Sequence, residues 1–158
     1  MNGNIFPNLV KVFYTNLTFE GENISSHVKG VEMEITPDVW TNVTSFKYTE
    51  AKVGKGNNSA LEDFNKMQYY ISCLRNHLTK VKGFHVGALK LNECVITFIT
   101  TWILKPNTSN HVLLTKEDLV LVYCKTKKIK VNWIYVFKEY MLKYVRLSDY
   151  HFPYVILV

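Results

Sequence analysis

The chain has 158 residues, of which 47% are hydrophobic and 20% are charged, so we expect one folded domain over residues 1–158 and exclude general disorder. The net charge of +6 is unevenly distributed. Residues 66–158 hold fourteen Lys and Arg against five Asp and Glu, whereas residues 1–65 hold five against eight. A basic second part indicates an acidic partner, such as nucleic acid.

The sequence shows no sign of membrane insertion or secretion. Its longest apolar stretch, Cys94–Leu104, is interrupted by three threonines and is far shorter than the roughly 20 residues of a membrane span. Residues 1–10 lack the regions of a secretory signal, so we expect an intracellular protein without membrane contact. The cysteines are odd in number and widely spaced, which favours reduced thiols. They are Cys73, Cys94 and Cys124.

The first predicted elements are a helix, a hairpin and a second helix. Apolar residues at helical spacing, with a proline in the first turn, predict a helix at residues 6–17. Alternating apolar and acidic residues predict a small β-hairpin at residues 17–36. A short helix should follow, because Thr36 can cap it, Pro37 suits its first turn and Asp38 compensates its dipole.

A flexible loop is predicted at residues 52–59, where glycine and asparagine favour turns. Ser59 then caps a predicted helix whose apolar side chains recur every three or four residues. These side chains are Leu61, Phe64, Met67, Ile71, Leu74 and Leu78.

The next predicted helix is apolar around most of its surface, so we expect it at the centre of the core. Its apolar side chains include Leu91, Val95, Phe98, Ile99, Trp102 and Ile103. The helix should end before Pro106, because the residue that precedes a proline avoids helical geometry.

Two capped helices complete the chain. Thr115 and Asp118 approximate a capping box, and Asn132 can cap a final helix with one apolar side. That side consists of Trp133, Phe137, Tyr140, Met141 and Tyr144. The tail at residues 147–158 ends in four apolar residues, which predicts either a fragment whose next element is missing or a tail that enters the core as a strand.

Together these elements predict a mainly α fold, a single helical domain of five or six helices with a small N-terminal β-hairpin. No pattern typical of catalysis accompanies it. A Gly-x-Ser-x-Gly motif is absent and the five histidines are dispersed, so no catalytic residue, metal or cofactor is expected. The loop at residues 53–57 resembles a phosphate loop, but it lacks the required spacing and is interpreted as a solvated turn.

A run of lysines at residues 125–130, followed by an aromatic and basic helix, is the candidate site. Basic side chains on one accessible surface would contact phosphates, and aromatic rings would stack on unpaired bases. The candidate nucleic-acid-binding residues are Lys125, Lys127, Lys128, Lys130, Lys138, Lys143 and Arg146. The alternative is a solvated basic face, because lysines at the end of a helix favourably meet its dipole and aromatic residues at helical spacing usually belong to a core.

Four segments of the chain carry a family resemblance. They are FPNLVKVFYTNL at 6–17, VKGVEMEITP at 28–37, the predicted helix at 91–106, and the block at 114–141 that begins LTKEDL. In content and order they resemble the plant transposon protein domain family. The resemblance spans nearly the whole chain and implies a part of a longer mobile-element protein without established catalytic residues. One departure is residues 105–110, where relatives carry an arginine-containing segment.

Several functions stay open. The first is a non-catalytic module of a mobile element that associates with RNA or DNA, or serves in assembly, through the basic residues above. The second is a protein-interaction module of a polyprotein, in which the aromatic surface of the last helix, or the tail from Phe152 to Val158, pairs with the missing remainder; a large exposed apolar patch would favour it. The third is a degenerate fragment without function. An enzyme ranks last, because its catalytic groups would have to come together from distant residues.

Overall fold

The computed structural model describes residues 6–46, 61, 64–76, 81–105 and 112–147. Of these residues, 59% are helical and 16% lie in strands or bridges, so the chain is mainly helical. The predicted loop at 52–59 and the tail after residue 147 lie outside the described residues. Backbone contacts divide the chain into unit 1, Met1–Tyr48 with Trp133–Val158, and unit 2, Thr49–Asn132. The prediction of one domain stays a prediction.

The predicted N-terminal hairpin is wrong, because unit 1 contains a three-stranded antiparallel sheet in the order β1-β2-β3. Its strands are β1 (Thr18–Glu20), β2 (Asn23–Val28) and β3 (Val31–Ile35). β1 spans three residues and is too short to show an alternating pattern in the sequence. The turn between β2 and β3 holds Lys29 at φ 50° and Gly30 at φ 82°, the backbone that a two-residue hairpin turn requires.

Two short helices flank this sheet in the chain. The helix predicted at residues 6–17 is confirmed as α1 (Pro7–Thr15), and it is tied to β2 by a buried hydrogen bond that Ser26 Oγ donates to the carbonyl of Phe13, at 2.8 Å. The second helix is confirmed as α2 (Pro37–Thr44), and the Thr36 hydroxyl accepts a hydrogen bond from the third residue of that helix, as predicted.

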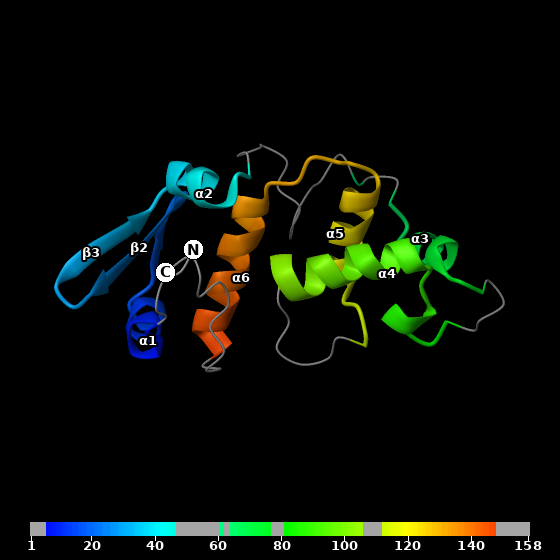
Figure 1. Ribbon diagram of the computed structural model, residues 1–158, viewed down its shortest axis with the longest axis horizontal. Helices are drawn as coiled ribbons and strands as arrows, with labels where there is room; N and C mark the ends of the chain where they lie inside the picture. Colours follow the sequence, from blue (N-terminus) through cyan, green and yellow to red (C-terminus); the bar gives the residue numbers. More distant parts are fainter. Residues whose placement is uncertain (1–5, 47–60, 62–63, 77–80, 106–111, 148–158) are drawn as a thin grey trace. The chain divides into compact units, whose positions relative to one another are not determined.

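The last helix, α6 (Trp133–Leu147), belongs to unit 1 although it lies about ninety residues after α2 in the sequence. The rings of Trp40 and Phe137 lie 5.7 Å apart, and those of Phe46 and Trp133 lie 6.0 Å apart. The predicted apolar side of the helix is buried throughout. Figure 1 shows α6 in orange, with the sheet of unit 1 in blue.

Unit 2 contains α3 (Lys66–Cys73), η2 (Val86–Ala88), α4 (Leu91–Phe98), η3 (Ile99–Leu104) and α5 (Lys116–Thr126). Its core consists of Tyr70, Cys73, Leu74, Leu89, Leu114 and Leu119. The helix predicted from Ser59 is partly wrong, because α3 begins only after Asn65, whose side chain caps it, and ends at Cys73. Met67 and Ile71 of the predicted stripe are exposed, and Leu78 lies outside the described residues.

α4 and η3 form one continuous helical run that ends before Pro106, as predicted. Its last six residues are wound as a π-helix, in which the Lys105 amide donates to the carbonyl of Thr100 at 2.8 Å. The predicted place at the centre of the core is wrong, because large apolar side chains of this helix are exposed while Thr97, Thr100 and Thr101 are buried.

The burial of threonines has a local explanation. The hydroxyl of Thr100 donates to the carbonyl of Ile96 at 2.8 Å, and that of Thr101 donates to the carbonyl of Thr97 at 2.9 Å. A hydroxyl satisfied within its own helix can be buried at little cost, so the threonine side of α4 and η3 packs on α5. A prediction from hydrophobicity alone therefore assigns the wrong face of this helix to the core.

Candidate interaction surfaces

The predicted capping box at the start of α5 is confirmed. The Thr115 hydroxyl accepts from the Asp118 amide at 3.1 Å, and the Asp118 carboxylate accepts from the Thr115 amide at 2.9 Å. This box fixes the first turn of α5, and the helix runs to Thr126, so the lysine-rich segment lies at its C-terminal end.

α5 ends in a Schellman turn, a hydrogen-bonded reversal of the backbone that closes a helix. The Ile129 amide donates to the Cys124 carbonyl at 2.8 Å, and the Lys128 amide donates to the Lys125 carbonyl at 3.3 Å. Lys128 takes the left-handed conformation at φ 56°, at the position where glycine is usual. A side chain at this position costs the fold roughly 1 kcal/mol.

Four of the seven predicted basic residues surround this turn. We call them the lysine cluster: Lys125, Lys127, Lys128 and Lys130, all of which are exposed. Lys125 lies in the last turn of α5, where its charge also meets the negative end of the helix dipole. The cluster therefore concentrates four positive charges within six residues on the surface of unit 2.

The remaining three predicted basic residues lie on α6, in unit 1. The Lys138 ammonium donates to the carbonyl of Gly21 at 2.8 Å, and the Lys143 ammonium lies 6.0 Å from the centre of the Tyr140 ring. Arg146 is part of the helix, but its side chain lies outside the described part of the chain. The seven residues thus form two groups, and a single basic face stays a prediction.

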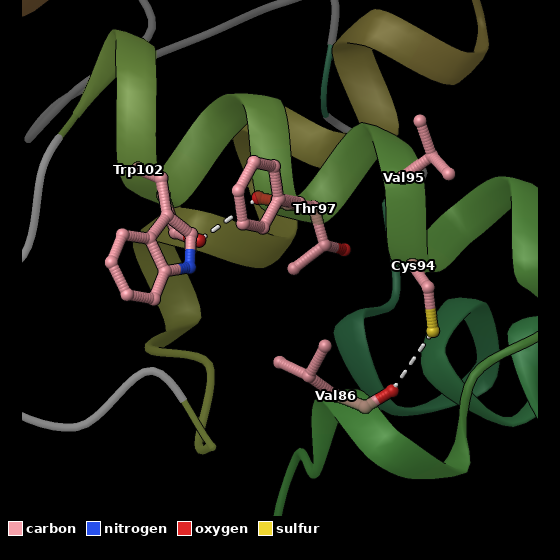
Figure 2. A pocket seen from close by; sticks show the side chains of 7 residues that line it. Val86, Cys94, Val95, Thr97 and Trp102 are labelled. Carbon is pink, nitrogen blue, oxygen red and sulfur yellow. Dashed lines mark hydrogen bonds between the residues drawn. The ribbon is translucent and has the colours of Figure 1, made fainter.

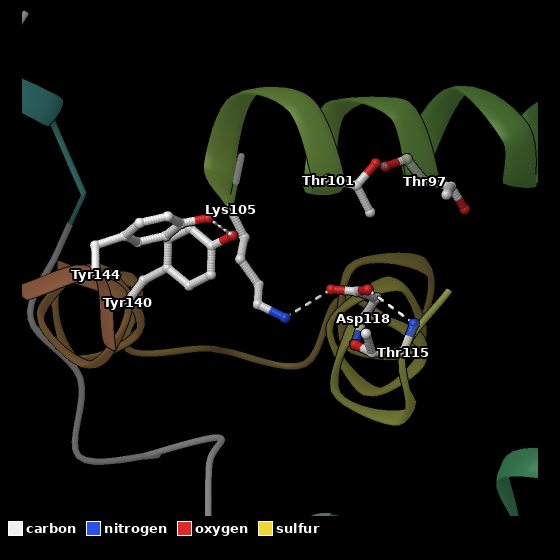
Figure 3. Close-up of polar contacts among 7 residues, drawn as sticks. All are labelled: Thr97, Thr101, Lys105, Thr115, Asp118, Tyr140 and Tyr144. Atoms are coloured by element: carbon white, nitrogen blue, oxygen red, sulfur yellow. Dashed lines mark hydrogen bonds and ion pairs between the residues drawn. The ribbon is translucent and has the colours of Figure 1, made fainter. Parts of the chain in front are cut away.

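The aromatic surface predicted for the last helix is wrong. The aromatic side chains of α6 that face the core are only 3–8% exposed, and they are Trp133, Phe137, Tyr140 and Tyr144. The hydroxyls of Tyr140 and Tyr144 also contact each other at 3.0 Å, as Figure 3 shows. These rings form the core of unit 1 and are not available to a partner.

Exposed apolar side chains are found instead on α4 and η3. We call this surface the apolar helix face: Leu91, Val95, Phe98, Trp102 and Ile103, each 49–75% exposed. The rings of Phe98 and Trp102 stack on each other, with centres 5.5 Å apart and planes 25° apart. Because monomeric proteins rarely expose a contiguous set of large apolar side chains, this face is a candidate for protein interaction.

An open pocket of about 340 Å³ lies beside the apolar helix face, between η2 and the helix (Figure 2). Val86 of η2 lines one side, and the side chains of Val95 and Trp102 belong to the other. The Cys94 thiol donates to the carbonyl of Val86 at 3.2 Å and joins the two segments. Thr97, also in the lining, is buried, and its hydroxyl has no hydrogen-bond partner among the described residues.

A buried ion pair joins the end of η3 to the start of α5. The Lys105 ammonium lies 2.8 Å from the carboxylate of Asp118, whose side chain is fully buried (Figure 3). Burial raises the pKa of Asp118, but the charge of Lys105 and hydrogen bonds from Lys105 and Thr115 together lower the pKa below its ordinary value. The sequence predicted only the cap, because nothing local to Asp118 indicates a partner thirteen residues away.

The three thiols differ in their burial. Cys73 and Cys124 are buried, and Cys94 is half-buried. Burial raises the pKa of the Cys124 thiol to about 11, so the thiol stays protonated near neutral pH. Among the residues that the structure describes, no group of three His, Cys, Asp or Glu side chains could hold a metal ion, and no helix is long and apolar enough to span a membrane.

Comparisons of the chain with protein-family models, with curated proteins and with solved structures find no match. The resemblance to a plant mobile-element family therefore rests on the quoted sequence segments alone. The features of the described residues that bear on function are the lysine cluster and the apolar helix face.

Proposed function

We propose that the chain is a non-catalytic, intracellular module, derived from a plant mobile element, that binds nucleic-acid phosphates through the lysine cluster. The observation that carries this proposal is the display of four exposed lysines on the Schellman turn of α5, with Lys128 in a left-handed conformation.

The chemistry of the cluster suits phosphate rather than a base edge. Lysine carries a compact charge on a flexible stem, which makes it a contact for phosphate without sequence preference. Four such contacts would give log Kobs a slope against log salt of about −4 on duplex DNA and about −3 on single strands. The aromatic rings of α6 are buried, so base stacking on them is not part of the proposal.

The test is fluorescence anisotropy of the purified chain with labelled single-stranded RNA, single-stranded DNA and duplex DNA at several salt concentrations. A variant with Lys127→Glu, Lys128→Glu and Lys130→Glu should lose binding while its circular dichroism stays unchanged. The matched control carries the same change of charge at three exposed lysines elsewhere. It is Lys29→Glu, Lys82→Glu and Lys116→Glu, and it should keep most of the affinity.

Absence of binding to all three nucleic acids would overturn this proposal. Equal loss in the cluster variant and in the control would also overturn it, because binding would then depend on the net charge and not on the lysine cluster.

A second candidate function is protein interaction through the apolar helix face. The specific observation in its favour is the exposure of five large apolar side chains on one helix, two of them aromatic and stacked. This replaces the predicted aromatic surface of the last helix. The other predicted site, the tail from Phe152 to Val158, lies outside the described residues.

A further inference from the structure

The apolar helix face has the spacing of a helix-pairing seam. Leu91, Val95, Phe98 and Trp102 follow one another at intervals of four, three and four residues; the first three keep the coiled-coil repeat in α4, and Trp102 extends the row into the π-helical turns of η3. The buried threonines lie on another side of the same helix, against α5. The seam is therefore directed away from α5, and one side of it borders the pocket that Val86 of η2 also lines.

The order of side-chain sizes along the seam indicates the direction of pairing. Leu91 and Val95 are the smaller residues at the beginning, and Phe98 and Trp102 are the larger ones at the end. In an antiparallel pair of identical helices, Leu91 lies opposite Trp102 and Val95 lies opposite Phe98, so each layer combines a small with a large side chain. A parallel pair would place the two Trp102 rings against each other.

The flanks of the seam are compatible with self-pairing. On one side of the core positions lie Asn92 and Ile99, which carry no charge, and on the other side lie Cys94, bonded to η2 of the same chain, and the buried Thr101. Two copies would therefore meet without repulsion between like charges along the seam. In the antiparallel arrangement the two helix dipoles also oppose each other, which favours this direction.

We propose that a second copy of this chain covers the apolar helix face, in a two-fold antiparallel pair of the helices at residues 91–104. The pair is isologous, so one surface serves both copies and the assembly closes as a dimer. This inference deepens the second candidate function and is independent of nucleic-acid binding.

The size of the face sets the expected strength of the dimer. Five side chains that are 49–75% exposed contribute on the order of 500 Å² per copy, or about 1,000 Å² in total. Specific interfaces of this small size are weak, so a dissociation constant on the order of 10 µM is expected.

The first experiment is sedimentation velocity of the full chain without nucleic acid, from about 1 to 200 µM, a range that brackets this weak affinity. The wild-type chain should shift from monomer to dimer as its concentration rises. The double variant Phe98→Glu and Trp102→Glu should stay monomeric with unchanged circular dichroism, because both side chains are about half exposed. The double control Val31→Glu and Val112→Glu, at exposed apolar residues outside the face, should dimerise like wild type.

The direction of pairing is tested by mild oxidation in a Cys94→Ser background. An equimolar mixture of Leu91→Cys and Trp102→Cys chains should form a disulfide-linked dimer several times faster than either variant alone. Linkage of Leu91→Cys chains alone at the same rate would overturn the antiparallel arrangement.

A wild-type chain that stays monomeric over the whole range, or a glutamate double variant that dimerises normally, would overturn the self-pairing proposal. The lysine-cluster variant separates the two proposals. It should dimerise like wild type even though it fails to bind nucleic acid. A wild-type chain that dimerises but binds none of the three nucleic acids would overturn only the nucleic-acid proposal.

Discussion

Substitution of Lys128 tests whether its left-handed backbone destabilises the fold while its side chain contributes to nucleic-acid binding. Substitution Lys128→Gly should raise the free energy of unfolding by about 1 kcal/mol, because glycine adopts φ 56° without steric conflict. Urea denaturation measures this gain. The same variant should bind nucleic acid more weakly if the lysine cluster is the contact surface.

Lys29→Gly is the matched control, since Lys29 also has a positive φ of 50° but lies in the turn between β2 and β3. It should gain similar stability without losing affinity for nucleic acid. A Lys128→Gly variant no more stable than wild type would show that the left-handed conformation of Lys128 carries no strain.

The buried ion pair of Lys105 and Asp118 makes stability depend on acid pH. The pKa of Asp118 is lower in the folded chain than in the unfolded chain, where it is about 3.9, so the unfolded state binds the proton first as the pH falls. The contribution is complete above the unfolded pKa and is lost as the pH falls through the folded pKa.

We expect Asp118→Asn to lower the free energy of unfolding at pH 7 by about 3 kcal/mol, because the largely buried ammonium of Lys105 loses the carboxylate that lies 2.8 Å from it. Urea titrations of both proteins from neutral to acid pH should show the difference shrinking as the pH falls below about 4. A difference that stays constant across this range would contradict the assigned pKa.

At the scale of the element, α4 and η3 show how a helix can bury its less hydrophobic side. Thr97 is the exception among the buried threonines, because its hydroxyl has no partner among the described residues. Substitution Thr97→Val replaces this hydroxyl with a methyl group of similar size and should raise the free energy of unfolding by about 1 kcal/mol. Thermal or urea denaturation measures the change.

Thr100→Val is the control, because the Thr100 hydroxyl already donates to the carbonyl of Ile96 at 2.8 Å. Its substitution removes a satisfied group together with a weak intrahelical bond, so the stability should change little. Equal gains in both variants would mean that the lack of a partner at Thr97 is not the cause.

The elements differ in how well their sequence predicts them. The caps of α2 and α5 were predictable because a cap depends on residues within one turn. The strand β1, which the predicted hairpin lacked, was not predictable, because it is short and depends on its pairing with β2. α3 also ended earlier than its apolar pattern predicted, since Leu74 leaves the helix to form a bridge with Leu89.

For the whole molecule, the prediction of a single domain can be tested by unfolding. Trp40 and Trp133 belong to unit 1, whereas Trp102 belongs to unit 2. In a Trp102→Phe variant, tryptophan fluorescence reports on unit 1 alone, and far-ultraviolet circular dichroism reports on the helices of both units. If residues 1–158 form one cooperative domain, the two urea transitions should coincide. Separate midpoints would mean that the units unfold independently.

The sequence by itself determined the local features of this protein. These include the capped starts of α2 and α5, the helix end before Pro106, the apolar side of α6 and the lysines at the end of α5, and all of them depend on neighbouring residues. Only the tertiary structure decided that α6 joins unit 1, that Lys105 pairs with Asp118, and that α4 and η3 expose their apolar side. The physical reason is that capping and helix periodicity act over a few residues, whereas burial depends on which distant segments supply the covering surface.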